Sequence, residues 1–305
     1  MGTYILKRFM QGILTILVVT MVVFLSLHAT GDPAALLAPM DAQPAEVATL
    51  RVRLGLDRPL YVQYIDFLSH ALRGDMGDSF RYKQPAMSLI LPSLSRSLEL
   101  GIPAILISCL LAIPLGIVSA VHRGTAFDAS ILLAALIGQA TPVFLLSIIL
   151  IWVFAVHLHW FPASGTGSLA DFVLPVISIV AYNLAILTRL TRSSMLEILG
   201  ADYVRTARAK GLTEIVVLAK HALRNAGISV ISLIGLQIGT VLSGMLVVET
   251  IFAWPGLGWL IYSAVLQRDI PLVMAGATAI AVMVVVLNLC VDLSYALLDP
   301  RIRLR

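Results

Sequence analysis

The chain has 305 residues, of which 59% are apolar and 12% are charged, and its net charge is +4. A soluble domain carries about twice this proportion of charged residues, because charged surface must cover its core. The composition excludes a disordered chain, a nucleic-acid-binding protein and an ordinary soluble enzyme, and it indicates an integral membrane protein.

Six segments are apolar and long enough to cross a bilayer, which takes about 20 helical residues. They cover residues 9–31, 100–121, 129–156, 172–188, 225–248 and 270–291. The first follows Lys7 and Arg8 as a signal peptide would, but the five later spans favour a retained helix. The fourth is short and begins near Pro175, so we expect Arg189 to extend to the membrane surface and complete it. The sequence thus predicts an all-α polytopic fold with six transmembrane helices.

The distribution of Lys and Arg predicts the orientation of these spans. If the N-terminus is inside, the loops and ends on that side hold thirteen Lys and Arg residues, whereas loops 157–171 and 249–269 hold only Arg268. Short loops rich in Lys and Arg stay in the cytoplasm, and segments longer than about 60 residues translocate regardless of charge. Both termini are therefore predicted to be cytoplasmic, with the long segment 29–98 outside.

That outside segment is expected to contain two short helices. One runs from Pro44 to Leu54 and is ended by Gly55, and the other covers 59–72 with Gly74 after it. The second helix has an apolar face made of Leu60, Tyr64, Phe67, Leu68 and Ala71. This face predicts an amphipathic cap on the membrane or on the helix bundle, and a docking surface for an extracytoplasmic partner is the alternative.

Sequence motifs for chemistry are missing. The chain has no phosphate-binding loop, so it is not expected to hydrolyse ATP. His157 and His159 are two positions apart and would face different sides of a helix, which favours an interfacial aromatic belt over a metal site. No catalytic residue and no metal ligand is expected.

The segment between the fourth and fifth spans is the most informative part of the chain. It is basic and rich in helix formers, and it predicts one helix at 193–210 and another at 213–223. Thr213 is a plausible N-cap, and Gly211 suits the left-handed position that closes the first helix. A protruding helix pair indicates either a part that docks into another protein or a solvated connector, and the pattern alone does not separate these.

Several motifs resemble those of the ABC importer permeases, in the oligopeptide, dipeptide and nickel subfamily. The segment 202–212 reads DYVRTARAKGL and is followed by HALRNA at 221–226. Further matching motifs are GDP at 31–33, LGLDRP at 54–59, GDMG at 74–77, ETIFAWPGLG at 249–258, RDIP at 268–271 and LDPRIR at 298–303. The chain is most similar to the first permease of such a pair, which carries the long loop.

The resemblance implies a type I ABC importer permease. It divides the chain into the first helix with the extracytoplasmic segment (1–97), a five-helix transmembrane domain (98–298) with its coupling loop (189–226), and a cytoplasmic tail (299–305). The implied partners are a second homologous permease in a heterodimer, two ATPase subunits, an extracytoplasmic solute-binding protein and the lipid bilayer of a bacterial inner membrane. ATP and Mg would be bound by the ATPase subunits, and no cofactor is expected in this chain.

The resemblance also implies which residues couple ATP hydrolysis to transport. We hypothesise that the helix pair at 199–224 is a rigid lever between the ATPase subunits and the spans. Its expected coupling residues are Asp202, Tyr203, Arg205, Thr206, Ala207, Arg208, Lys210, Gly211 and Leu212. Arg205, Arg208 and Lys210 would supply charge complementarity, and Ala207 and Gly211 would permit close approach.

Polar residues within the spans mark a candidate translocation path, because polar groups that face lipid are costly. They are Gln139, Thr141, Asn183, Gln237, Ser243 and Glu249. Hydrogen bonding between helices is the alternative for each of them. Glu249 could line the outer mouth, pair with Arg268 or bind an amine of the substrate. Pro114 and Pro142 are expected to kink their helices.

The substrate class is left open between three readings. Peptides come first, and a nickel chelate, glutathione or another small solute comes second within the same family. On composition alone, a proton-coupled secondary transporter is also compatible, although no carboxylate lies in the middle of a span. A membrane enzyme would need a nucleophile or a metal cluster that the sequence does not contain.

Overall fold

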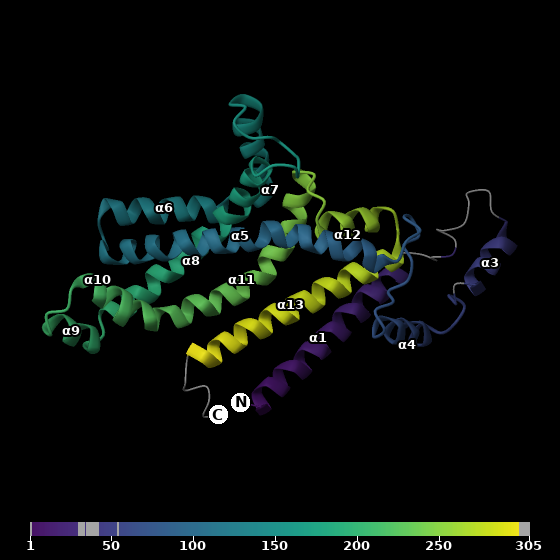
Figure 1. Cartoon of the computed structure of the whole chain (residues 1–305), viewed down its shortest axis with the longest axis horizontal. Coiled ribbons are helices and arrows are strands. Elements are labelled where there is room, and N and C mark those ends of the chain that lie inside the picture. The colour runs from purple at the N-terminus through teal and green to yellow at the C-terminus, as the bar shows by residue number, and fades with distance from the viewer. Residues whose placement is uncertain (1, 30–33, 35–42, 54, 299–305) are drawn as a thin grey trace. The chain divides into compact units, whose positions relative to one another are not determined.

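The computed structural model describes residues 2–29, 34, 43–53 and 55–298, with the backbone alone at some helical positions. The expected tail at 299–305 lies outside these residues. All regular elements in the described part are helices (Figure 1). They are α1 (Gly2–Ala29), α3 (Pro44–Arg53), α4 (Leu60–Ala71), α5 (Ala86–Val121), α6 (Ala126–Ala140), α7 (Val143–Leu150), η1 (Ile151–His157), α8 (Ala170–Leu199), α9 (Asp202–Ala209), α10 (Glu214–Val216), η2 (Val217–Ala222), α11 (Leu223–Ile251), α12 (Leu257–Leu266) and α13 (Ile270–Leu298).

In the part of the chain that the structure describes, the predicted spans fall on helical segments, with one break at Thr141 and Pro142. Within the described residues, parts of α1, α5, α8 and α13 are each long and apolar enough to cross a membrane. The segment from α6 to η1 passes the same test as a bent pair. The backbone of α11 covers the predicted span at 225–248. The all-α, multi-pass membrane fold is thereby confirmed.

The third span is not a single straight helix. The two parts Ala126–Ala140 and Val143–His157 meet at 101°. The break is at Thr141 and Pro142, whose ψ angles of 117° and 137° are extended. Proline lacks an amide hydrogen and ends a helix on its N-terminal side, so the expected kink at Pro142 is confirmed. Pro114, by contrast, lies within the continuous helix α5.

The fourth span is longer than expected. Helix α8 begins at Ala170, so Pro175 lies within its second turn, and the helix has 30 residues. At 1.5 Å per residue it is about 45 Å long, which exceeds the roughly 30 Å of the hydrocarbon core. This length includes the charged residues from Arg189 onward, so the expectation that Arg189 reaches the membrane surface stays a prediction.

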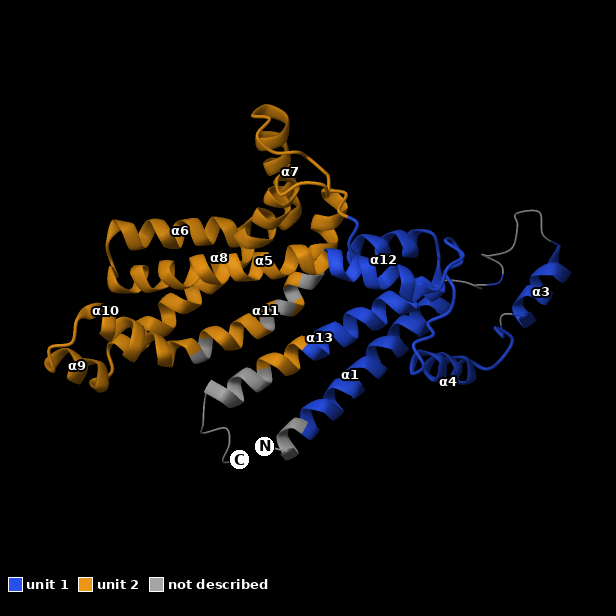
Figure 2. Cartoon of the chain, in the orientation of Figure 1, with its two compact units in different colours: residues 1–96, 255–286 blue, residues 97–254, 287–305 orange. Residues whose placement is uncertain are grey.

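The chain divides into two compact units (Figure 2). The first contains residues 1–96 and 255–286. Within it, α4 packs on α1, because the Tyr64 hydroxyl donates a 2.8 Å hydrogen bond to the carbonyl of Leu17, and its ring lies 5.5 Å from that of Phe24. The predicted cap on the helix bundle is thus observed, and Gly55 follows the end of α3 with a positive φ of 67°.

The first unit also contains a helix that the sequence did not predict. The sequence predicts a loop at 249–269, but α12 occupies Leu257–Leu266. Its buried residues Leu257 and Leu260 share a core with Ile90 of α5 and Leu272 of α13. Ten residues are too few to cross a membrane, so α12 covers the ends of longer helices.

The second unit contains residues 97–254 and 287–305. Its main core joins α5, α7, α8 and α11 through Leu100, Leu150, Leu174 and Val248. Gly116 of α5 allows close packing, since a Cβ there would lie 2.5 Å from the Cβ of Thr191 and 2.9 Å from the carbonyl oxygen of Thr188. This unit holds both the basic loop and the polar residues of the predicted path.

Candidate coupling surface and translocation path

The basic loop contains one short helix instead of the long one expected. Helix α8 ends at Leu199, and α9 begins at Asp202. The prediction of a continuous helix at 193–210 was therefore wrong. Gly200 is the C-cap of α8, and Ala201 has an extended ψ of 147°. Glycine disfavours the interior of a helix, and here it separates a membrane helix from the loop.

The second helix of the loop is continuous with the fifth span. It starts at Glu214 and passes through the π-helical segment η2 into α11. Thr213 occupies the N-cap position as expected, but its side chain makes no capping hydrogen bond. Any movement of this segment is therefore connected directly to a membrane helix, because no flexible linker separates them.

Helix α9 is fixed on one face by apolar packing. Val204 and Ala207 are 0% and 5% exposed, and they form a cluster with Val217 of η2 and the end of α8. Ala207 therefore faces the protein interior. Val204 was not predicted as a site residue, although the spacing of three between it and Ala207 is that of one helix face. The remaining predicted coupling residues are exposed: Asp202, Tyr203, Arg205, Thr206, Arg208, Lys210, Gly211 and Leu212.

The turn between α9 and α10 is closed by an ion pair. Nε and Nη2 of Arg208 donate hydrogen bonds of 3.1 and 2.6 Å to the two carboxylate oxygens of Glu214. These hydrogen bonds hold the pKa of Glu214 below its ordinary value and raise that of Arg208. The pair neutralises Arg208. Nη1 of Arg205 lies 3.6 Å from Oδ1 of Asp202, in a pair that is open to solvent, and Lys210 is exposed at the C-cap of α9.

Two further features hold the loop in one conformation. Gly211 has a φ of +76°, in the left-handed region, and a Cβ there would meet nothing within 4 Å. Its requirement for glycine is therefore conformational, not steric. On the other side of α9, the amide nitrogen of Asn225 donates a 2.9 Å hydrogen bond to the hydroxyl of Tyr203. Helix α9 is thus attached to both α8 and α11.

The outer surface of the loop combines charge with exposed apolar side chains. Ile215 is 80% exposed, and Leu212 and Val216 are exposed beside it. Exposed apolar residues with a charged rim are typical of a protein interface. Ile215 and Val216 were not predicted, because motif matching placed the site at 202–212.

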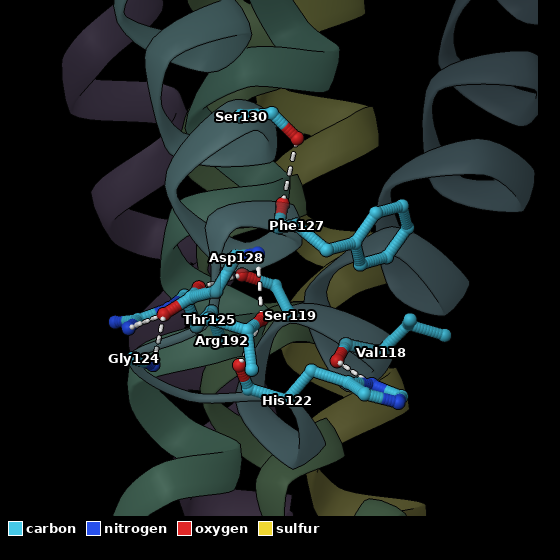
Figure 3. A network of polar contacts seen from close by, with 9 residues as sticks. All are labelled: Val118, Ser119, His122, Gly124, Thr125, Phe127, Asp128, Ser130 and Arg192. Atoms are coloured by element: carbon cyan, nitrogen blue, oxygen red, sulfur yellow. Dashed lines mark hydrogen bonds and ion pairs between the residues drawn. The ribbon is translucent and has the colours of Figure 1, made fainter.

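A buried polar network fixes the other turn of this unit (Figure 3). Arg192 of α8 donates two hydrogen bonds of 2.7 Å to the carboxylate of Asp128 on α6. The same carboxylate accepts hydrogen bonds from the Ser119 hydroxyl at 2.5 Å and the Gly124 amide at 3.0 Å. Three helices are therefore tied together. The sequence did not reveal this network, since its partners are up to 64 positions apart.

The predicted path residues occupy different environments. Thr141 donates to the carbonyl of Ile137 at 2.8 Å, and Gln139 accepts a hydrogen bond from Arg189. Asn183 and Gln237 are buried. The amide nitrogen of Asn183 donates to the carbonyl of Ile179. The side chain of Ser243 lies outside the described residues.

Glu249 is fully buried near the end of α11. Its Oε1 accepts a 2.5 Å hydrogen bond from the Ser97 hydroxyl. The turn after α11 is also held, because the amide of Trp254, three residues beyond the helix end, donates to the carbonyl of Glu249 at 2.8 Å. Glu249 therefore joins α5 to α11 within the second unit.

A cavity of about 540 Å³ lies between α6, α8 and α11. Its polar lining consists of Gln139, Arg189, Arg192 and Ser193, and its other walls are apolar. Of the path residues whose side chains the structure describes, Gln139 alone lines it.

Family descriptions match nearly all of the chain. Residues 112–304 match the family described as "Binding-protein-dependent transport system inner membrane component", and residues 1–99 match the N-terminal part of such components. The chain is a member of this permease family.

Curated relatives of the permease match along its whole length. It is 38% identical to the dipeptide transport system permease protein DppB of Escherichia coli K12, with 98% of each chain covered. It is 39% identical to the glutathione transport system permease protein GsiC of Salmonella typhimurium, with 99% of each covered. The dipeptide permease of Alkalihalophilus pseudofirmus is 37% identical, with 99% of this chain and 100% of the relative covered.

Solved structures share the fold of the permease. The inward-facing MetNI methionine ABC transporter has a TM-score of 0.57 at 16% identity, and the match covers 70% of this chain and 97% of that one. An amino acid ABC transporter solved with histidines has a TM-score of 0.52 at 17% identity, covering 70% and 94%. The permease therefore has the type I ABC importer fold, and membership of the family implies ATPase and other transporter subunits.

Proposed function

We propose that this permease forms half of the translocation pathway of an ATP-driven peptide importer in a bacterial inner membrane. The observation that carries the proposal is its 38% identity to a dipeptide permease along 98% of both chains. Partners would be a second homologous permease in a heterodimer, two ATPase subunits that bind ATP and Mg, and an extracytoplasmic solute-binding protein. The chain has no phosphate-binding loop, so ATP hydrolysis is assigned to those partners.

The coupling element of the proposal is the segment 199–224. Its helix α9 is attached to α8 by the Val204 and Ala207 packing and to α11 by the Tyr203–Asn225 hydrogen bond. A displacement imposed on α9 would therefore reach two membrane helices at once. Arg205, Lys210 and the exposed residues Leu212 and Ile215 would contact the ATPase subunit. This role is consistent with two conformations whose populations ATP changes.

The test is uptake by the reconstituted transporter. The permease would be purified with its partner permease and ATPase subunits and placed in proteoliposomes with the solute-binding protein. We expect labelled dipeptides to accumulate with ATP, but not with a non-hydrolysable analogue. Accumulation driven by a proton gradient without ATP would overturn the proposal in favour of a secondary transporter.

Glutathione is the second candidate substrate, because the glutathione permease is equally similar at 39% identity. Competition separates the two candidates. An excess of unlabelled glutathione should leave dipeptide uptake unchanged if peptides with ordinary peptide bonds are the substrate. Complete inhibition by glutathione, with its γ-glutamyl bond, would favour the second candidate. Because the solute-binding protein also selects, its ligand should be measured by calorimetry.

A further inference from the structure

The side chain of Arg189, ten residues before the end of α8, points away from the basic loop. Its Nη1 donates a hydrogen bond to Oε1 of Gln139. Gln139 is the fourteenth of the fifteen residues of α6. It lies about 20 Å along that helix from Ala126, at 1.5 Å per residue. The guanidinium of Arg189 thus extends towards the far end of α6, not towards the loop that contains α9.

The neighbouring Arg192 provides a reference for how far along α6 the Arg189 side chain reaches. Arg192 pairs with Asp128, the third residue of α6. Gln139 lies eleven residues beyond Asp128, about 16 Å further along α6, whereas Arg189 and Arg192 are separated by only about 4.5 Å along α8. The side chains of Arg189 and Gln139 extend along the helices and span the remaining distance between the two positions. Side chains in a helix point towards its N-terminus, which gives Arg189 this direction.

The charges of the two arginines are compensated differently. Arg192 is neutralised by the carboxylate of Asp128. Arg189 donates to a neutral amide, and among the described residues no carboxylate lines the cavity. The cavity of about 540 Å³ therefore carries a net positive charge between apolar walls. Arg189 is exposed to this cavity, and an ionisable residue of a membrane helix that faces a cavity marks an ion or substrate pathway.

We infer that this cavity is a carboxylate-binding subsite on the translocation path and that Arg189 is its ligand. The inference rests on the proposed function, because a peptide carries a carboxylate at its C-terminus. The guanidinium presents two parallel donors that fit a carboxylate. The carboxylate displaces Gln139 from Arg189 and relieves the uncompensated charge. Ser193, on the same wall, supplies a hydroxyl donor.

The test compares a dipeptide with its C-terminally amidated form in the reconstituted transporter. The readout is the ratio of the initial uptake rates of the free acid and the amide, at saturating solute-binding protein. Because every variant uses the same binding protein, its own preference cancels between variants. We expect Arg189→Gln to lower this ratio about tenfold relative to wild type, and Arg189→Lys, which keeps the charge, to restore part of it.

A second variant neutralises the subsite without removing the arginine. Gln139→Glu places a carboxylate beside Arg189 and should lower the ratio to a similar extent. Arg123→Gln is the matched control, since Arg123 is exposed in the turn before α6 and lies outside the cavity. The purified complexes are compared at equal abundance of all subunits, so a folding defect is detected separately.

The outcomes distinguish this inference from the proposed function. Equal loss of acid and amide uptake in Arg189→Gln would overturn the subsite while leaving peptide import intact. An unchanged ratio in both Arg189→Gln and Gln139→Glu would do the same. Absence of any peptide uptake by the wild-type transporter would overturn the proposed function and this inference with it.

Discussion

The hydroxyl of Ser79 donates a 2.5 Å hydrogen bond to the carboxylate of Asp269, a residue 190 positions further along the chain. Asp269 is 1% exposed. Its carboxylate also accepts hydrogen bonds from the backbone amides of Phe80, Arg81 and Leu272. It therefore holds the turn before α5 against the first turn of α13, within the first unit.

This relationship predicts that Asp269→Ala destabilises the first unit by about 2–4 kcal/mol, because it leaves several buried donors without an acceptor. The measurement is the unfolding temperature of the purified permease in detergent. Asp75→Ala is the control, since Asp75 is exposed and accepts only from the amide of Gly77 among its described hydrogen bonds. Equal unfolding temperatures for the two variants would contradict the role of Asp269.

The Asp128–Arg192 pair in the second unit should show strong energetic coupling. The Asp128 side chain is 5% exposed, and Arg192 donates to both its oxygens. Removing one partner of a buried pair costs about 3–5 kcal/mol because the other charge is left behind. We therefore expect Asp128→Asn and Arg192→Gln each to be strongly destabilising, and the double variant to lose much less than their sum. A double-mutant cycle of unfolding free energies measures this, and additive effects would refute the coupling.

The Arg208–Glu214 pair should make the loop sensitive to acid. The pKa of Glu214 is lowered by the hydrogen bonds from Arg208. Its stabilising effect is therefore complete above the ordinary carboxylate pKa and is lost as the pH falls through the lowered value. Both side chains are more than 40% exposed, so solvent screening limits the effect to about 0.2–1 kcal/mol.

Hydrogen exchange of the peptide 202–222 is the measurement for this pair. Between pH 7 and about pH 5, protection relative to the intrinsic exchange rate should be constant, and it should fall under more acidic conditions. Glu214→Gln should lack this acid-dependent step. A wild-type loop whose protection declines between pH 7 and pH 6 would point to another titrating group.

Gly211 should be required for coupling through its backbone conformation. Gly211→Val forces a β-branched residue into the left-handed region, which is strongly disfavoured. We expect uptake to be abolished while the complex still inserts into the membrane. Gly74→Val is the matched control, because Gly74 has a φ of +80° and a Cβ there also meets nothing within 4 Å. Normal uptake by Gly211→Val at normal abundance would exclude the lever mechanism.

Local features of this permease were predictable from sequence, and long-range ones were not. The positive φ of Gly211 and the helix end at Gly55 follow from glycine placed after a helical pattern. The break at Pro142 follows from proline geometry. The Ser79–Asp269 pair depends on residues brought together only by packing of distant helices, so no local periodicity indicates it.

The coupling surface was predicted only in part, because some of its features depend on long-range packing. The motif at 202–212 located α9, but it did not indicate that Ala207 is buried or that Arg208 is neutralised by Glu214. Both facts depend on the path of the chain after Gly211. The hydrogen bond between Arg189 and Gln139 was equally unpredictable from sequence, because it depends on where α6 lies relative to α8.

The π-helical segment η2 imposes a requirement on chain length. A π-turn holds more residues than an α-turn, and η2 presents Val217 to Val204 and Ala207 of α9. Deleting one residue between Val217 and Ala222 would change the facing of η2 relative to α11 by about 100°, the rotation per residue of an α-helix. Val217 would then no longer face Val204 and Ala207 of α9. The spacing between the basic loop and the fifth span is therefore as constrained as the motif itself.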